Sequence, residues 1–288
     1  MRKLDRLAAD RFQYENSIAW RLERVTTCGL RLKKEIVSVT ITAAPTQTIV
    51  CMKWGVRYPS VYVNNLWSMI RRNTARPTRL VCYTDEATGI GPDVTVLPMP
   101  SLTLPGKFTN LPWRKISLWA KDVPGISGDV LFLDLDIVIT GSLDEFFDYK
   151  PDRTFCVIEN WTQMGSGIGN TSCYRFRVGS HPYIHERLRN DPEAVLGTHR
   201  NSQTYISRTI SEKAFWPAPW CVSFKHSILP RWPLNFVAPP ALPPDAKIIS
   251  FTGKPDIDEA RDGWSDPRWY KKLYKHVRPT PWIAEHWR

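Results

Sequence analysis

Two aspartates separated by one residue follow a short apolar run and could carry chemistry. The string VLFL (130–133) leads directly into Asp134, Leu135 and Asp136. In a strand, residues two apart project to the same face, so both carboxylates could bind one cation. A hard divalent cation held by one or two carboxylates keeps positions free for phosphate oxygens and would neutralise a diphosphate leaving group. The pair therefore indicates a site for a phosphate-bearing substrate.

Apolar runs alternate with helical patterns around these aspartates. Buried strands are expected over 47–54, 79–85, 93–99, 128–140 and 246–254, and helices from Ser60 onward and over 112–122. Such alternation is typical of an α/β fold with a mostly parallel central sheet and helices on both faces. Ligands of these sheets bind beyond the carboxyl ends of the strands. The residues that fall at such ends are Lys53, Trp54, Asp85, Asp134 and Asp136.

The two ends of the chain differ from this central pattern. The C-terminal half is rich in Trp, Pro and short turns, as expected of a binding face built from loops. Residues 1–45 form a basic N-terminal extension, expected to be helical or poorly ordered. The apolar positions that could share one helical face are Leu4, Leu7, Ala8, Phe12 and Ile18. A helix of this kind could lie on an anionic membrane surface, so peripheral membrane contact is left open.

Composition limits the classes of partner. The 288 residues include 39 Lys and Arg against 28 Asp and Glu, a net charge of +11. This excess suits nucleic acid, an anionic membrane or a phosphate-bearing small molecule, but no run of five or six basic residues provides a nucleic-acid arm. No long apolar run or secretory pattern is visible, and the cysteines form no CxxC pair. We therefore expect a cytoplasmic protein that does not bind nucleic acid.

Several strings, in this order, resemble the bacterial GT-A-fold nucleotide-sugar glycosyltransferases related to glycogenin and to the lipopolysaccharide galactosyltransferases. The strings are CMKWGVRYPSVYVNNL, LVCYTD, PWRKISLW, VLFLDLDIVITGSLDEFF, GNTSCYRF and ISFTGKP. The resemblance covers residues 46–288, which it implies form one GT-A domain. It implies a retaining, metal-dependent transferase of polysaccharide biosynthesis, with a nucleotide-sugar donor and a carbohydrate or glycolipid acceptor.

The resemblance also implies roles for individual residues. Those that would bind manganese or magnesium, and through it the donor diphosphate, are Asp134 and Asp136. Those that would lie near the nucleoside are Lys53, Trp54 and Asp85. Those that would reach the donor sugar or the departing diphosphate are Lys115, Asn170, Gln203, Gly253 and Lys254.

Two departures from the family pattern leave alternatives open. Thr252 stands where the family has a metal-binding His, and Ser202 precedes Gln203 where the family has Asp. A hydroxyl replaces imidazole poorly on a borderline metal, although it suits an oxygen-rich shell. One alternative is therefore a catalytically impaired homologue that acts as a binding or regulatory protein. Another is a haloacid-dehalogenase-type phosphatase, in which Asp134 would be the nucleophile and Asp136 the acid/base.

Overall fold

The computed structural model describes residues 18–24, 30–36 and 46–288, and the chain divides into two compact units, Met1–Ala44 and Pro45–Arg288. In the first unit, β1 (Ile18–Arg24) pairs antiparallel with β2 (Leu30–Ile36). The helix expected in the extension is therefore wrong for these two ranges. The large apolar residues of β1 are Ile18, Trp20 and Leu22, at every second position, and this period of two favours a strand. The other apolar positions of the expected helix lie outside the described residues, namely Leu4, Leu7, Ala8 and Phe12.

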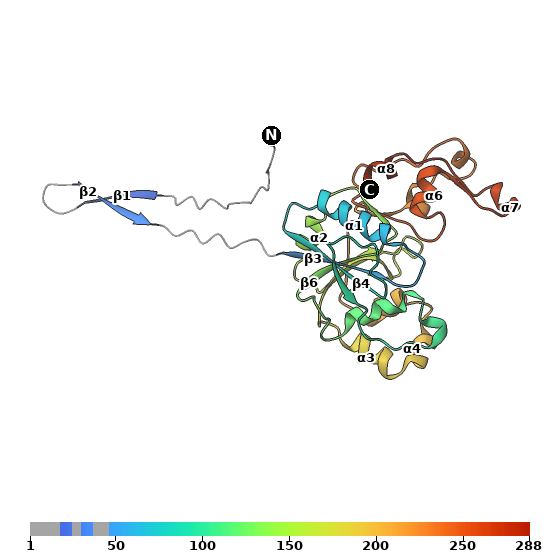
Figure 1. The fold of residues 1–288 in the computed structure, drawn as a ribbon, viewed down its shortest axis with the longest axis horizontal. Helices are drawn as coiled ribbons and strands as arrows, with labels where there is room; N and C mark the ends of the chain where they lie inside the picture. The colour runs from blue at the N-terminus through green and yellow to red at the C-terminus, as the bar shows by residue number, and fades with distance from the viewer. Residues whose placement is uncertain (1–17, 25–29, 37–45) are drawn as a thin grey trace, which may run out of the picture. The chain divides into compact units, whose positions relative to one another are not determined.

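A seven-stranded sheet forms the centre of the second unit (Figure 1). In order across the sheet, the strands are β10 (Ala214–Phe215), β8 (Phe155–Glu159), β9 (Gly169–Arg177), β6 (Asp129–Leu133), β3 (Gln47–Lys53), β4 (Thr78–Thr84) and β5 (Thr95–Pro98). The ladders joining β6, β3, β4 and β5 are parallel, and β9 runs antiparallel to both of its neighbours. The expected mostly parallel α/β sheet is confirmed.

Both faces of this sheet are covered, because its central strands are apolar on both sides. In β3, Ile49 and Cys51 belong to one hydrophobic core, and Val50 and Met52 belong to a second core on the opposite face. The first core includes α1 (Ser60–Arg72) and Phe146 of α2 (Asp144–Asp148), which lie above the sheet in Figure 1. The second core lies on the side of α3 and also contains the segment before β6.

The remaining helices are short. They are η1 (Gly106–Phe108), η2 (Pro112–Trp119), α3 (Tyr183–Asn190), α4 (Pro192–Thr198), α5 (Ser202–Thr209), η3 (Phe224–Ile228), η4 (Leu234–Phe236), α6 (Ile257–Asp262), α7 (Trp269–Lys272) and α8 (Trp282–His286). The helix expected over 112–122 is present as the 3₁₀ helix η2, which ends at Trp119. None of the described helices is both long and apolar enough to cross a membrane. From Ile210 onward the elements are brief, as expected of a loop-rich C-terminal region.

The strand expected over 128–140 is divided in two at the aspartates. β6 ends at Leu133, and β7 (Ile137–Ile139) begins after Asp136 in a separate three-stranded sheet with β12 (Ile248–Ser250) and β11 (Cys221–Ser223). The chain bends between the two sheets, so strand alternation does not set the direction of the two carboxylates. The bend places both aspartates where the two sheets meet.

Candidate active site

Lys115 and Asp134 form an ion pair at the carboxyl end of β6. The Lys115 Nζ lies 2.6 Å from Asp134 Oδ1, and the lysine side chain is only 6% exposed. Lys115 also donates to the carbonyl oxygen of Thr171, and Asp134 is tied to β9 by its own amide, which donates to Ser172 O at 2.8 Å. Burial raises the pKa of Asp134, and the positive charge of Lys115 opposes that rise. The pair is thus a fixed cation beside a carboxylate at a sheet end.

Asp136 has a hydroxyl group rather than a cation as its neighbour. Its Oδ2 accepts a hydrogen bond of 2.9 Å from the Tyr58 hydroxyl. Burial, together with the negative charge of Asp134, raises the pKa of Asp136 to about 7. The two neighbouring carboxylates therefore share one compensating lysine, and a second cation would be accommodated favourably beside Asp136.

The chain that leaves β12 is bonded through its backbone to the segment that carries the aspartates. The amide of Phe251 donates to the Asp136 carbonyl oxygen at 2.9 Å, so Thr252 follows directly beside the Asp-Leu-Asp bend. The two carboxylates are oxygen donors, and oxygen donors suit magnesium or manganese. Within the described residues, no three His, Cys, Asp or Glu side chains gather in one place. A cation bound here would therefore complete its shell with water or with substrate oxygens.

A second group of predicted residues lies at the ends of β3 and β4. Lys53 is 5% exposed and donates to Glu86 O at 3.3 Å. The indole of Trp54 donates to Asn110 O at 3.3 Å, and Asp85 accepts from the Gly55 amide at 3.1 Å. These contacts connect the loops that follow the two strands. We call the surface formed by Lys53, Trp54 and Asp85 the rim.

Asn170 and the Ser202-Gln203 pair come from elements packed on each other. Asn170, 8% exposed in β9, accepts a hydrogen bond from the Ser172 amide through Oδ1. Ser202 and Gln203 open α5, where Ser202 is 3% exposed. The Ser207 hydroxyl of the same helix accepts from the Gly169 amide at 2.8 Å, which fixes α5 against the start of β9. Asn170 therefore lies in the same strand as Ser172, two residues before it, and the Ser172 carbonyl oxygen accepts from the Asp134 amide.

Lys254 is paired with two carboxylates of the segment that follows it. Its Nζ lies 2.7 Å from Asp256 Oδ2 and 2.6 Å from Glu259 Oε1, and its side chain is 55% exposed. These two carboxylates raise the pKa of Lys254. The preceding Gly253 has a φ of +77°, and a Cβ there would meet no atom within 4 Å. The glycine is therefore explained by its backbone conformation.

Three solved structures share the arrangement of these elements. The galactosyltransferase LgtC, solved with donor and acceptor sugar analogues, matches with a TM-score of 0.52 and 12% identity over 73% of this chain and 89% of its own. The glycosyltransferase GlyE of Streptococcus pneumoniae TIGR4 matches with a TM-score of 0.50 and 14% identity over 73% of this chain and 56% of its own. The bifunctional WbbM matches with a TM-score of 0.50 and 13% identity, covering 88% of this chain and 54% of that one.

The chain has the GT-A glycosyltransferase fold. No known protein family and no curated protein matches the sequence. The fold decides against the phosphatase alternative, which requires the aspartate pair after the first strand of a different sheet. Here β3, β4 and β5 precede β6 in the second unit.

The loop after β3 connects the three groups of predicted residues in this GT-A fold. Gly55 contacts Asp85, and the Arg57 Nη2 lies 3.3 Å from Asp256 Oδ1. The next residue, Tyr58, contacts Asp136. Sequence reasoning missed Arg57 and Tyr58, because neither residue type in a loop points to a partner so distant in the chain. Their only signal is their place directly after the first strand of the sheet.

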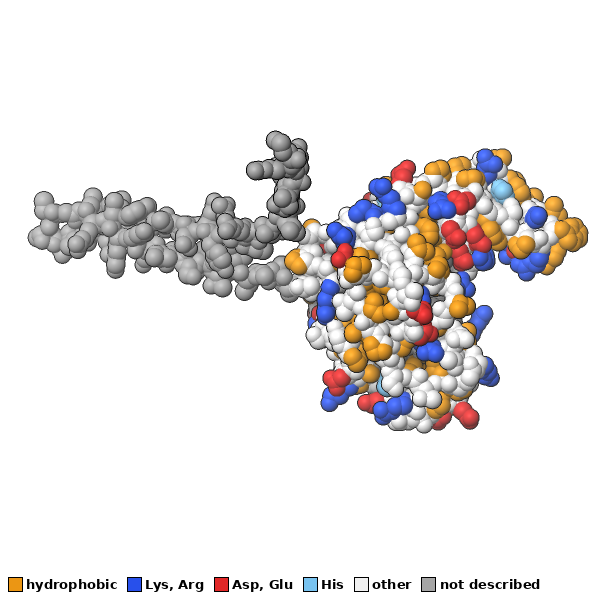
Figure 2. Space-filling model, viewed as in Figure 1, with side chains coloured by type: hydrophobic (Ala, Val, Ile, Leu, Met, Phe, Trp, Pro, Cys, Tyr) orange, Lys and Arg blue, Asp and Glu red, His pale blue; other side chains and the backbone are white. Residues whose placement is uncertain are grey.

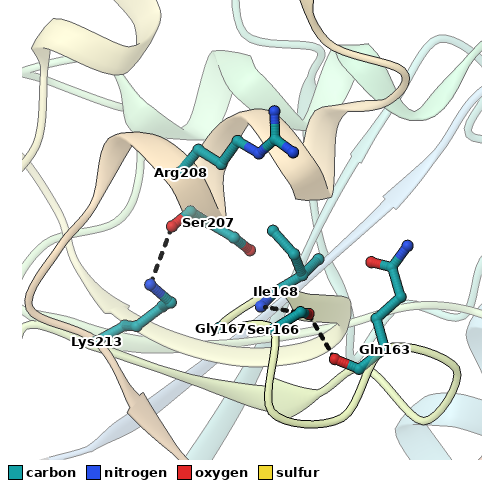
Figure 3. A pocket seen from close by; sticks show the side chains of 7 residues that line it. All are labelled: Gln163, Ser166, Gly167, Ile168, Ser207, Arg208 and Lys213. Carbon is teal, nitrogen blue, oxygen red and sulfur yellow. Dashed lines mark hydrogen bonds between the residues drawn. The ribbon is translucent and has the colours of Figure 1, made fainter.

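A pocket of about 550 Å³ lies between α5 and the turn that precedes β9 (Figure 3). Its lining residues are Gln163, Ser166, Gly167, Ile168, Ser207, Arg208 and Lys213. Figure 3 shows Lys213 directed at the carbonyl oxygen of Ser207, to which it donates at 3.0 Å. The Lys213 ammonium group therefore already binds a carbonyl oxygen near the carboxyl end of α5. The pocket borders the elements that carry Asn170 and Gln203, although neither residue lines it.

Proposed function

We propose that the protein transfers a glycosyl group from a nucleotide-sugar donor to a carbohydrate or glycolipid acceptor. One observation carries the proposal: a buried lysine and two aspartates lie together at the carboxyl end of β6 in a GT-A fold. A nucleoside diphosphate gains negative charge as it leaves the sugar, and fixed cations stabilise that charge. Lys115 is such a cation, held in place by Asp134 and Thr171.

The roles of the other residues follow from their positions. The nucleoside would lie along the rim of Lys53, Trp54 and Asp85, and the sugar near Asn170 and Gln203. A bond forms between the acceptor oxygen and the anomeric carbon, while the bond from that carbon to the diphosphate breaks. The acceptor hydroxyl gives its proton to an oxygen of the departing diphosphate, which leaves as the nucleoside diphosphate. Retention of configuration is part of the proposal, and an NMR assignment of the product anomer tests it.

We also propose that magnesium or manganese binds at Asp136 and Asp134, with Thr252 beside them. When bound, the cation would neutralise charge on the diphosphate. Asp136 is better placed than Asp134 to bind the cation, because Asp134 already forms an ion pair with Lys115. Tyr58 would orient the Asp136 carboxylate through its hydrogen bond.

The acceptor is expected against the turn between β8 and β9. Glu159 ends β8 and accepts from the Gly165 amide at 2.7 Å, which folds the turn back on the strand. A hollow of about 50 Å³ beside it, smaller than a sugar ring, is lined by Glu159, Trp161, Met164 and the buried Trp216 among others. A sugar would lie against the opening of this hollow, where the half-buried Trp161 ring can stack on it and Glu159 can accept its hydrogen bonds. Surface polysaccharide is the acceptor class that we propose.

Thermal stability in the presence of nucleotides tests the proposal most directly. One nucleoside diphosphate, tested with manganese or magnesium, should raise the melting temperature by about 5 °C or more at saturating concentration. Removal of the metal with EDTA should reduce this shift, and the matching nucleoside without phosphates should give none. If no nucleoside diphosphate stabilises the protein with either metal or without one, the donor assignment is wrong.

An impaired homologue is the second candidate function, favoured by Thr252 beside Asp136 and by the absence of three clustered metal-ligating side chains among the described residues. The double variant Thr252→His with Ser202→Asp restores both family residues. Its activity distinguishes an active transferase from an impaired homologue. We expect an active parent and a gain of no more than about tenfold. A silent parent that gains about 100-fold or more would establish the impaired homologue instead.

A further inference from the structure

The pocket of about 550 Å³ between α5 and the turn before β9 has no part in the proposed donor site (Figure 3). Its volume lies within the range of about 300–1,000 Å³ that is usual for small-molecule sites. The described residues that line it include two bases, Arg208 and Lys213, and no Asp or Glu. By contrast, basic and acidic side chains lie interspersed over most of the face shown in Figure 2. The charge of this pocket therefore favours an anion.

Both bases keep N–H groups that a ligand can use. Arg208 is exposed and forms no ion pair within the described part of the chain, and its planar guanidinium matches a carboxylate or a phosphate. Lys213 donates to Ser207 O at 3.0 Å and to Ile210 O at 3.2 Å, which uses two of the three N–H groups of its ammonium. Gln163, on the turn, adds a side-chain amide to the lining (Figure 3).

Hydrogen bonds hold both walls of the pocket. The Ser207 hydroxyl accepts from the Gly169 amide at 2.8 Å and fixes α5 against β9. In the turn, the Ser166 hydroxyl donates to the Gln163 carbonyl oxygen, and the next residue, Gly167, has a φ of +72°. The shape of the pocket is therefore fixed by the chain itself, so that little ordering is needed when a ligand binds.

The acidic residues closest in sequence to the pocket have other partners. Glu159 accepts from the Gly165 amide at 2.7 Å. Glu212, which precedes Lys213, lies 3.8 Å from Arg153, and its side chain is 83% exposed. Neither glutamate is among the described residues that line the pocket. The positive charge of the pocket is therefore not neutralised from within.

The turn that forms one wall also contributes to the surface where the acceptor is expected. Gln163 and Ser166 line the pocket, and Trp161 and Met164 of the same turn line the hollow beside Glu159. We propose that the pocket binds the carboxylate or phosphate group of an acidic carbohydrate acceptor. This inference rests on the proposed transfer reaction and names the class of its acceptor. A neutral acceptor would leave both bases of the pocket without a counter-charge.

NMR titration of small sugars with the full chain, without any donor, tests the binding. Glucuronate and glucose 6-phosphate should bind with a Kd on the order of 1 mM at low salt. Glucose, which carries no charge, should bind about tenfold more weakly or less. Inorganic phosphate should also bind about tenfold more weakly than glucose 6-phosphate, because it lacks the sugar ring.

Three variants assign this binding to the pocket. Arg208→Gln should weaken the binding of glucuronate about tenfold or more. Arg208→Lys, which keeps the charge without the planar fork, should weaken it only a few-fold. The matched control is Arg189→Gln, which removes an exposed arginine of α3 outside the pocket and should bind like the parent. Melting temperatures will show that each variant is folded, and nucleoside diphosphate binding should be unchanged in all of them.

A longer acidic sugar tests whether the pocket belongs to the acceptor surface. Trigalacturonate should bind about tenfold more tightly than galacturonate, because it extends from the pocket over the turn. Trp161→Leu should remove this gain and leave the binding of galacturonate unchanged. Since neither a donor nor transfer is involved, failure of the nucleotide screen would leave these results interpretable.

Four outcomes would overturn the inference. If glucuronate and glucose 6-phosphate bind no better than glucose, the pocket does not select for an anion. If Arg208→Gln and Arg189→Gln weaken binding alike, the anion responds to the overall charge of the protein. If inorganic phosphate binds as tightly as glucose 6-phosphate, the pocket is a site for free phosphate. If trigalacturonate gains nothing over galacturonate, the pocket is separate from the acceptor surface.

Discussion

Asp136→Asn is expected to lower turnover by about 10³-fold, the upper range for removal of one electrostatic stabiliser. The substitution keeps the shape of the side chain and can still accept the Tyr58 hydrogen bond, so the loss would report the charge itself. Asp134→Asn should give a comparable loss of turnover. The measurement is steady-state transfer with the nucleotide sugar that the stability screen selects.

The same two substitutions should change the stability of the metal-free protein in opposite directions. Asp136 lies beside the like charge of Asp134, and only the lysine that already pairs with Asp134 and the Tyr58 hydroxyl compensate its charge, so Asp136→Asn should stabilise the protein by about 1–3 kcal/mol. Asp134→Asn instead leaves the buried Lys115 ammonium without its counter-charge and should cost about 3 kcal/mol. Urea unfolding in EDTA measures both values. Tyr58→Phe, which keeps both charges, is the control and should lower turnover only a few-fold.

Equal losses of stability from both aspartate variants would contradict this account of the site. They would mean that the charge of Asp136 is compensated as fully as that of Asp134, and not only by the shared Lys115 and the Tyr58 hydroxyl. An active Asp136→Asn variant would contradict the proposed role of its charge. The two readouts are independent, because one requires substrate and the other is made without it.

The central sheet could be predicted from the sequence because its strands are apolar on both faces. The runs containing Ile49 to Met52 and Leu80 to Tyr83 are short, buried and separated by a helix with regular apolar spacing. Residues at the carboxyl ends of parallel strands must lie near one edge. The order of strands and helices along the chain was therefore enough to place Lys53 and Asp85 at that edge.

Features that depend on contacts distant in the sequence could not be predicted. The division of 128–140 at the aspartates follows from the pairing of β7 with β12, more than a hundred residues later. The partners of Lys254 could not be identified either, since two acidic residues close in sequence do not show which way a lysine points. The β1–β2 strand pair was missed because the helical interpretation weighed positions spread over 1–35, while the large apolar residues at every second position of 18–22 were a local signal.

Replacement of Lys254 is expected to cause the second large loss of turnover. Transfer leaves a nucleoside diphosphate whose charge must be met by cations, and Lys254 lies on the chain that continues from Phe251 beside Asp136. Lys254→Ala should lower turnover by about 10²-fold. Its stability should change by less than about 1 kcal/mol, because the side chain is half exposed and such pairs contribute little.

The two carboxylates that hold Lys254 should compete with the diphosphate for its ammonium group. Glu259→Gln retains an oxygen that can accept from the Asp256 amide at the start of α6 but removes one competing charge. It should therefore tighten nucleoside diphosphate binding a few-fold, measured by calorimetry, while Lys254→Ala weakens it. Lys121→Ala, at an exposed turn, is the matched control and should change neither quantity. If Lys254→Ala and Lys121→Ala lose activity alike, the basic surplus acts as a diffuse field and the diphosphate does not lie beside Lys254. If Glu259→Gln alone has no effect while Lys254→Ala is inactive, Lys254 reaches the diphosphate without leaving its ion pairs, and the competition described here is wrong.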